Sequence, residues 1–541
     1  MSRPDVTVVV AVYNTMPYLT QCLDSLVRQS IGRDRLEIVA VDDGSTDESG
    51  RELDRFAERY PGTVKVIHQA NSGGPAAPSN RALDVATGRY VYFIGSDDHL
   101  GEEALERMVA CADEHGSDVV VGKMVGTNGR YVHQALYKAD DPDVSLYDSA
   151  LPFTLANTKL FRRDLVEQHK LRFPEDMPVG SDQPFTIEAC VRARKISVLA
   201  DYTYYYAVKR GDASNITYRA NHLSRLRCTA RIMEHTAGLI EAGAQRDHVL
   251  RRHFTWELAK LVQDDFPHLD GATRTEVCAG IADLADRYFT EALRDSMDVK
   301  RRVRIALAQR GAVDHLVRAI EDEAAHGAPP LLLEDGRAYL RYPGFRDPAL
   351  GLPDRLFEVI GEAVPRQLAD GTRLEQAEWL QNGDDLSARL VVRVPVAGDG
   401  AGSASVRLAT KPLPKSADKP GGRRVPVGTD LPEAVGETAH APDGDGTLLE
   451  ATLPLPPVKA KLGVRIYLDV AGSTYEIPVP VQGTPLPLAR RWRDRVPYRI
   501  SANANPKGRL VITTAPLWEP SSGVALRLRR VLSPVKRKLT R

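Results

Sequence analysis

Two clusters of carboxylates follow apolar segments in the N-terminal part of this 541-residue chain. Asp42-Asp43 comes directly after Leu36–Val41, and Ser96-Asp97-Asp98 follows Tyr90–Ile94 after one glycine. Two acidic clusters facing one crevice would repel a bare phosphate group, but Mg²⁺ and Mn²⁺ prefer carboxylate oxygens and bridge them to a diphosphate. The pattern therefore predicts a nucleotide-diphosphate site that uses Mn²⁺ or Mg²⁺. A carboxylate at a strand end could also accept a hydrogen bond from a base or a ribose hydroxyl.

The elements that must position these carboxylates alternate between strand and helix patterns over the N-terminal quarter of the chain. Predicted strands are Val6–Val12, Leu36–Val41, Val64–His68, Tyr90–Ile94 and one that begins at Val119–Val121, and Glu102–Glu114 is a predicted helix. This alternation predicts an α/β fold with a parallel, doubly wound sheet. Ligands of such sheets bind beyond the carboxyl ends of the strands, where both acidic clusters lie.

Other phosphate-binding folds lack their motifs in this chain. No GxGxxG follows the first strand, and GxxxxGK[ST] does not occur. The glycines of Asn71–Pro75 could instead bring the backbone close to a ligand in the same crevice. Lys and Arg together number 72, as do Asp and Glu, and this balance argues against a nucleic-acid partner.

Cysteine usage and hydropathy predict the compartment. The five cysteines are scattered and form no CxxC, which argues against a disulfide scaffold or a structural zinc site and favours a reducing environment. Val6–Val12 is too short for the core of a signal peptide, and no segment approaches the roughly 20 apolar residues of a membrane span. We therefore expect a soluble, cytoplasmic protein.

Changes of pattern along the chain predict three regions, at 1–217, 218–328 and 329–541. The first carries the α/β pattern and the second is helical. The third has short strands between Gly- and Pro-rich loops and a hairpin signal at Asn382-Gly383, which is typical of a β-sandwich. Its last residues, 527–541, hold seven basic side chains and no acidic ones. This basic tail could lie on an anionic membrane surface, pack as a helix or fray.

Four motifs in this order resemble those of the family 2 inverting glycosyltransferases of the GT-A fold: Val9–Asn14, Val41–Asp47, Asn71–Gly74 and Ser96–Asp98. Further segments are similar to the wall teichoic acid β-N-acetylglucosaminyltransferases: Asn71–Leu83, Lys123–Arg130, Asp182–Phe185 and Ile196–Arg210. Those enzymes glycosylate poly(ribitol phosphate). The resemblance implies a Rossmann-like catalytic domain, a helical linker and one or two C-terminal immunoglobulin-like modules that trimerise.

The resemblance also implies how a UDP-sugar donor is bound. Ala11, Val12 and Tyr13 would flank the uracil. Asp43 would hydrogen-bond the edge of the base, with Asn71 nearby.

The remaining implied roles concern the transfer itself. Asp97 would hold the metal ion on the diphosphate, and Asp182 would be the catalytic base that takes the proton of the acceptor hydroxyl. Arg130, Lys209 and Arg210 would face the diphosphate or a phosphate-bearing acceptor. Without the resemblance, Asp182 could simply cap a helix, and Arg130 could be a solvated residue beside a hairpin turn.

This chain departs from the family at four positions. Gly95 stands where the family usually has Asp, Ser79 where it has Arg, Ser181 where it has Glu, and Ala11 where Pro is common. The missing aspartate removes the expected ribose ligand or shifts ribose recognition to Ser96. The other departures bear on which sugar the donor carries.

The expected function is metal-dependent, inverting transfer of GlcNAc or a related hexose from a UDP-sugar to a hydroxyl of an anionic cell-wall glycopolymer such as teichoic acid. One alternative keeps this chemistry with another acceptor, a capsular polysaccharide or a lipid-linked sugar. Another is a non-catalytic polymer-binding protein on a decayed transferase scaffold. We further expect a homo-oligomer, a trimer by resemblance, and the basic tail could contact the inner membrane face peripherally.

Overall fold

The computed structural model describes residues 3–211, 221–334, 337–360, 368–369, 371–383, 385–397, 406–412, 434–435, 438–443, 446–456, 458–470, 473–481, 488–493 and 496–517. The chain divides into two compact units, the first comprising Met1–Met297 and Arg304–Ile320 and the second Asp298–Val303 and Glu321–Arg541. The predicted basic tail lies outside the described residues, and the predicted three-region division stays a prediction.

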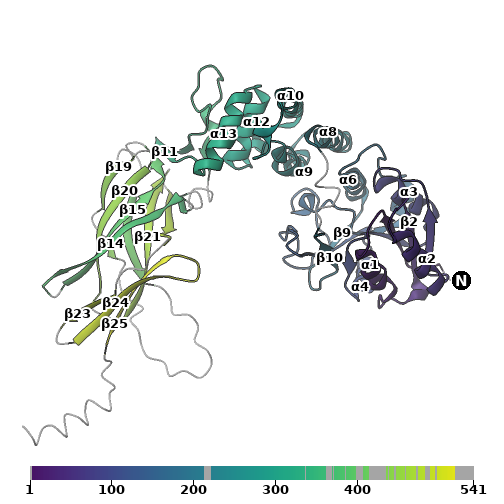
Figure 1. The fold of residues 1–541 in the computed structure, drawn as a ribbon, viewed down its shortest axis with the longest axis horizontal. Coiled ribbons are helices and arrows are strands. Elements are labelled where there is room, and N and C mark those ends of the chain that lie inside the picture. The colour runs from purple at the N-terminus through teal and green to yellow at the C-terminus, as the bar shows by residue number, and fades with distance from the viewer. Residues whose placement is uncertain are drawn as a thin grey trace, which may run out of the picture. The chain divides into compact units, whose positions relative to one another are not determined.

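A seven-stranded sheet in the order β3-β2-β1-β4-β8-β6-β9 forms the centre of the first unit. Its parallel strands β1 (Val6–Val12), β2 (Leu36–Asp42), β3 (Val64–His68) and β4 (Tyr90–Gly95) lie within one residue of their predicted bounds. Every residue of β2 is buried, as expected for a strand covered on both faces. The intervening helices are α1 (Tyr18–Val27), α2 (Ser49–Arg59), α3 (Ala76–Val85) and α4 (Ala104–His115) (Figure 1).

The predicted all-parallel sheet is wrong at one strand. The short β8 (Leu160–Arg162) lies between β4 and β6 (Val119–Gly122) and runs antiparallel to both, so the sheet is mixed. Three residues are too few to show a strand pattern in the sequence, which explains why β8 was missed. The last strand, β9 (Ile196–Leu199), is parallel to β6. Two helices, α5 (Arg163–Gln168) and α6 (Asp182–Arg192), lie between β8 and β9 in the sequence.

A small second sheet brings distant loops together. It has the order β5-β10-β7, formed by β5 (His99–Leu100), β10 (Tyr205–Val208) and β7 (Met124–Thr127). β10 runs parallel to β7 and antiparallel to β5. The turn after β7 and the chain after β10 therefore leave the sheet at the same end, which is also where the chain enters β5 from the β4 acidic cluster.

The rest of the first unit is helical, as predicted. It contains α8 (His222–Leu239), α9 (Ala244–Arg252), the π-helical segment η3 (His253–Leu258), α10 (Gly271–Tyr288), α11 (Glu291–Asp295), α12 (Val299–Gln309) and α13 (Val313–His326), of which α12 and α13 cross into the second unit. Asp270 caps α10 by accepting a hydrogen bond from the Thr273 N–H. In the described part of the chain, no helix is both long and apolar enough to cross a membrane.

The second unit is rich in strands, which confirms the predicted β region. The hairpin turn expected at Asn382-Gly383 joins β14 (Arg373–Asn382) to the antiparallel β15 (Asp385–Val394). The other strands are β11 (Leu331–Glu334), β12 (Arg337–Leu340), β13 (Glu358–Val359), β16 (Val396–Ala397), β17 (Val406–Pro412), β18 (Ala434–Val435), β19 (Thr438–Asp443), β20 (Gly446–Pro454), β21 (Ala460–Val470), β22 (Ser473–Pro478), β23 (Ala489–Arg493), β24 (Val496–Ala504) and β25 (Leu510–Pro516). Alternate residues of β15 are buried, so one of its faces packs on a core.

Candidate active site

The carboxyl ends of β2, β1 and β4 form one continuous edge of the large sheet. The three strands are parallel neighbours, and Ala11 of β1 lies opposite Val41 of β2 and Gly95 of β4. The loops beyond this edge are tied together, because the hydroxyls of Thr15 and Ser96 lie 2.9 Å apart. The residues predicted to contact the uracil and the metal therefore start from the same edge.

Asp43 organises the part of this edge that was predicted to bind the base. Its buried carboxylate accepts hydrogen bonds from Gln69 Nε2 at 2.7 Å, from Ser72 Oγ at 2.9 Å and from the Ser72 N–H at 3.1 Å. Asn71 Nδ2 donates to the Asp43 carbonyl oxygen at 2.9 Å. The structure thus brings Asp43 and Asn71 together, as predicted. It also shows that the carboxylate holds the glycine-containing segment after β3 against the end of β2.

The three predicted uracil neighbours differ in exposure. Tyr13 is 44% exposed and Ala11 is half-buried, whereas the Val12 side chain is 1% exposed and belongs to the hydrophobic core. The Val12 carbonyl oxygen accepts a hydrogen bond from the Asp43 N–H at 2.8 Å. A ligand at this edge would therefore meet Val12 through its backbone.

Two cation–carboxylate pairs form where the small sheet meets the end of β4. Arg210 Nε donates to Asp97 Oδ2 at 2.7 Å, and both side chains are largely buried. Arg130 Nη1 lies 3.4 Å from Asp98 Oδ1 and donates to the Val208 carbonyl oxygen at 3.0 Å. These contacts place Arg130 and Arg210 beside the acidic cluster.

Asp98 anchors the small sheet to the end of β4. It accepts hydrogen bonds from Tyr205 Oη at 2.6 Å and from the Val208 N–H at 2.7 Å. Burial and the neighbouring Asp97 charge raise the pKa of Asp98 to about 6. Lys209, the third predicted cation, is exposed.

The glycine at position 95 has a structural explanation. A Cβ atom placed there would lie 3.0 Å from Asp97 Oδ1 and 3.0 Å from Asp98 Oδ2. An aspartate at this position would therefore force the acidic cluster to shift. Ser96, the expected replacement for ribose binding, is buried and its hydroxyl already pairs with Thr15.

The residues at this edge fit a divalent cation held between protein and diphosphate. Asp97 and Asp98 are adjacent carboxylates in a buried environment, and a cation would relieve their mutual repulsion. In the described part of the chain, no group of three or more His, Cys, Asp or Glu side chains could hold a metal by itself. Asp97 could hold such an ion only together with ligands from outside the protein, such as diphosphate oxygens and water.

Asp182 is the first residue of α6, and an aromatic cluster fixes this helix against β4. The ring of Phe185, one turn into α6, stacks on Phe173 with 4.4 Å between centroids. The same ring meets Phe93 of β4 and Phe161 of β8 edge-on at 5.4 and 5.3 Å. Burial raises the pKa of Asp182, which makes a proton acceptor more basic. The charges of Arg252 and Lys159 act in the opposite direction.

Sequence analysis missed several side chains that support this site. Tyr205 was given no role within Ile196–Arg210, yet it donates to Asp98. Ser72 was noted only within its glycine segment, yet it binds Asp43. Arg252 and Glu257 of the helical region lie beside the start of α6, next to Gln183.

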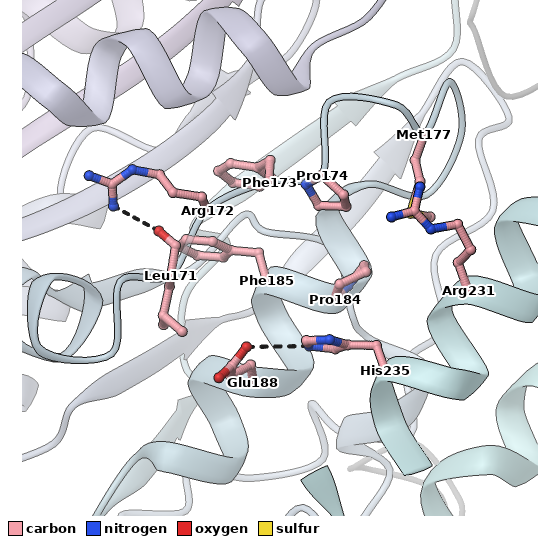
Figure 2. Close-up of a pocket in the computed structure, with 10 residues that line it drawn as sticks. All are labelled: Leu171, Arg172, Phe173, Pro174, Met177, Pro184, Phe185, Glu188, Arg231 and His235. Carbon is pink, nitrogen blue, oxygen red and sulfur yellow. Dashed lines mark hydrogen bonds and ion pairs between the residues drawn. The ribbon is translucent and has the colours of Figure 1, made fainter. Parts of the chain in front are cut away.

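A cavity of about 270 Å³ lies along α6 and is lined by Pro184, Phe185 and Glu188 of that helix. Figure 2 shows Arg172 and Arg231 on opposite sides, with the rings of Phe173 and Phe185 between them. Glu188 of α6 and His235 of α8 form an ion pair at 3.4 Å at its lower margin. The cavity thus separates α6 from α8 at a point where their side chains do not fill the space.

The mixed sheet with paired carboxylates and cations at its carboxyl edge defines a GT-A-type, Rossmann-like domain. Residues 7–174 match the family model described as glycosyl transferase family 2, and residues 226–320 match the one described as the glycosyl transferase TarS linker domain. Residues 7–174 thus form a family 2 glycosyltransferase domain, which confirms the resemblance noted in the motifs of that region.

Two curated relatives are similar over the N-terminal region. Poly(ribitol-phosphate) β-glucosyltransferase of Bacillus spizizenii is 43% identical over 214 residues, which cover 39% of this chain and 34% of that protein. TarS, the poly(ribitol-phosphate) β-N-acetylglucosaminyltransferase of Staphylococcus aureus strain MW2, is 41% identical over 204 residues, which cover 38% and 35%. The matched region spans about a third of the length of these relatives.

Solved structures are similar over a longer part of the chain. The crystal structure of S. aureus TarS has a TM-score of 0.62 at 23% identity, covering 95% of this chain and 86% of that one, which shows a shared fold. Residues 1–349 of TarS in complex with UDP-GlcNAc have a TM-score of 0.56 at 30% identity, covering 66% and 100%. These similarities confirm the predicted fold class, including its strand-rich C-terminal region.

Proposed function

We propose that this chain is a metal-dependent inverting glycosyltransferase that moves a hexose from a UDP-sugar to a hydroxyl group of poly(ribitol phosphate) or a similar anionic cell-wall polymer. The convergence of Arg210 with Asp97 and of Arg130 with Asp98, at the sheet edge that also carries Asp43, is the observation that supports this best. The two curated relatives are named for glucose and for N-acetylglucosamine. Both sugars are therefore candidates.

The proposed chemistry needs one proton acceptor and positive charge around the leaving group. The acceptor hydroxyl oxygen attacks the anomeric carbon, its proton passes to the Asp182 carboxylate, and the bond from that carbon to the diphosphate breaks with inversion. A Mn²⁺ or Mg²⁺ ion held by Asp97 would neutralise the charge that develops on the departing UDP. Arg210, Arg130 and Lys209 would add positive charge around the same diphosphate.

Nucleotide release with a donor panel tests this function. The intact chain would be given UDP-GlcNAc, UDP-glucose or GDP-mannose, each with poly(ribitol phosphate) and with Mn²⁺, Mg²⁺ or EDTA. We expect acceptor-dependent UDP release from one of the two UDP-glucose-type donors, and we expect EDTA to abolish it. Release that ignores EDTA would refute the role given to Asp97.

A second candidate function is supported by the altered acidic motif. Gly95 removes one carboxylate of the family motif, and a side chain there would press on the carboxylate oxygens of Asp97 and Asp98. A polymer-binding protein on an inactive transferase scaffold would bind poly(ribitol phosphate) without releasing nucleotide from any donor.

Turnover with a capsular polysaccharide or a lipid-linked sugar, but none with poly(ribitol phosphate), would instead change the proposed acceptor. Cytoplasmic location, trimer formation and membrane contact of the basic tail stay predictions.

A further inference from the structure

The helical region contributes polar side chains directly to the first turn of α6. Gln183, the residue after Asp182, accepts hydrogen bonds through Oε1 from Arg252 Nη1 at 3.0 Å and from His253 Nε2 at 3.2 Å. Gln183 Nε2 lies 3.4 Å from Glu257 Oε1, to which it donates. Arg252 Nη2 and the same Glu257 oxygen form an ion pair at 3.0 Å. These four residues are called the Gln183 cluster below.

The π-helical segment η3 explains why these side chains meet. Residues five apart, such as Arg252 and Glu257, are about 140° apart around an α-helix, because each residue turns the helix by about 100°. In a π-helix the backbone bonds i to i+5, so such residues lie near one another. The switch from α9 to η3 directly after Arg252 therefore places Arg252 and Glu257 on one side, facing Gln183.

The Gln183 cluster is buried, and its hydrogen bonds fix the orientation of each group. The side chains of Arg252 and Glu257 are 12% and 15% exposed, and His253 is fully buried. Burial lowers the pKa of His253 to about 4, so its ring is neutral and donates through Nε2. The Arg252 guanidinium also lies over the Trp256 ring, 5.3 Å from its centroid. Arg252 is thus held both by its hydrogen bond to Gln183 and by its contact with the Trp256 ring.

Charged groups approach Asp182 from the segment before β8 and from the helical region. Lys159, just before β8, is buried and donates through Nζ to the carbonyl oxygens of Thr154 and Ala156. Burial lowers the pKa of Lys159 to about 8, which leaves it mostly charged at neutral pH. Arg252 and Glu257 approach from the helical region, and both influence the Asp182 charge.

We propose that Arg252 is a positioning residue for the base, so that the helical region completes the active site rather than only joining two domains. Arg252 and Glu257 hold Gln183 and with it the first turn of α6, and the guanidinium favours the ionised form of the neighbouring Asp182 carboxylate. An ionised carboxylate is required to accept the proton of the acceptor hydroxyl. This inference rests on the proposed function, in which Asp182 is the base.

The test is the pH profile of kcat for a set of variants of the full chain. In Arg252→Ala, the acidic limb of the profile should move up by about one pH unit, since a nearby opposite charge typically shifts a carboxyl pKa by about one unit or more. Glu257→Gln should move the limb down, because it removes a negative charge. Arg252→Lys should restore most of the wild-type profile. Arg287→Gln, which breaks an exposed ion pair with Glu234 on the helical region, is the matched control and should leave the profile unchanged.

A stability measurement tests the same inference without turnover. Because burial raises the Asp182 pKa, the protonated group stabilises the fold at low pH. This stabilisation is lost as the pH rises from about 3.9, the unfolded pKa, through the folded pKa. The midpoint pH of that loss is read from the difference in melting temperature between wild type and Asp182→Asn. This midpoint pH should rise in the Arg252→Ala background.

Three results would overturn the inference. The acidic limb and the stability midpoint could both stay in place in Arg252→Ala. The two charge changes could shift the limb in the same direction, as a general loss of structure would. Arg252→Ala could also raise only the KM for the acceptor, which would make Arg252 a polymer ligand. If the wild type showed no turnover, the proposed function would fail, and the stability midpoint would still decide whether Arg252 acts on Asp182.

Discussion

The aromatic cluster that fixes α6 can be tested by Phe185→Leu. Phe185 is 1% exposed and packs its ring against Phe93, Phe161 and Phe173. Leucine keeps most of the apolar burial but loses all three ring–ring contacts. Each such pair contributes about 0.5–1.5 kcal/mol beyond burial, so local stability around α6 should fall by about 1.5–4.5 kcal/mol. The looser helix should also lower kcat, because Asp182 begins it.

Hydrogen-exchange mass spectrometry on peptides from β4 and α6 measures this local free energy, and nucleotide release measures kcat. Phe56→Leu is the matched control, because Phe56 of α2 is also 1% exposed but has Tyr60 as a tilted neighbour at 5.9 Å. We expect faster exchange in α6 and reduced kcat for Phe185→Leu alone. If the two variants exchanged alike in α6 and kept wild-type kcat, the cluster would not position the base.

Three further predictions concern the edge of the large sheet. Asp43→Asn removes the charged acceptor of the hydrogen bonds from Gln69 and Ser72 and of the bond expected from the base. Because hydrogen bonds to a charged group contribute about 1.5–3 kcal/mol, the Kd for UDP should rise at least tenfold in calorimetry. Arg210→Ala frees Asp97 from its cation, so kcat should fall about 10- to 100-fold while the Mn²⁺ concentration for half-maximal turnover does not increase. Hydrogen bonds to Asp42 and Asp54 raise the pKa of His68 in the folded protein. The stabilising effect of His68 is therefore complete below about pH 6.5, the unfolded pKa, and is lost as the pH rises through the folded pKa. The melting temperatures of wild type and His68→Gln should converge at high pH.

Much of the α/β fold could be predicted because its signal is local. The β-branched run Val6–Val12 can bury both faces only inside a sheet, and the structure gives it those bounds. The antiparallel β8 could not be predicted, because its three residues form a strand only through their pairing with Tyr90–Tyr92 and Val119–Val120.

In the candidate site, too, individual residues could be predicted from the sequence, but the side chains that contact them could not. Asp43, Asp97 and Asp182 could be chosen from the sequence, since each lies in a motif that resembles those of the family. Their partners depend on tertiary contacts that no spacing in the sequence reveals. Arg210 reaches Asp97 only because β10 pairs with β5 and β7, and Arg252 reaches Gln183 only through the local change from α- to π-helix.

Transfer by Asp182→Asn, compared with wild type, tests the central claim most directly. The amide keeps the size of the side chain but cannot take the proton of the acceptor hydroxyl. Hexose transfer to poly(ribitol phosphate) should therefore fall by about 10²- to 10⁴-fold, while calorimetry shows an unchanged Kd for the UDP-sugar. Wild-type transfer rates in the variant would contradict the account, because the proton would then have another acceptor.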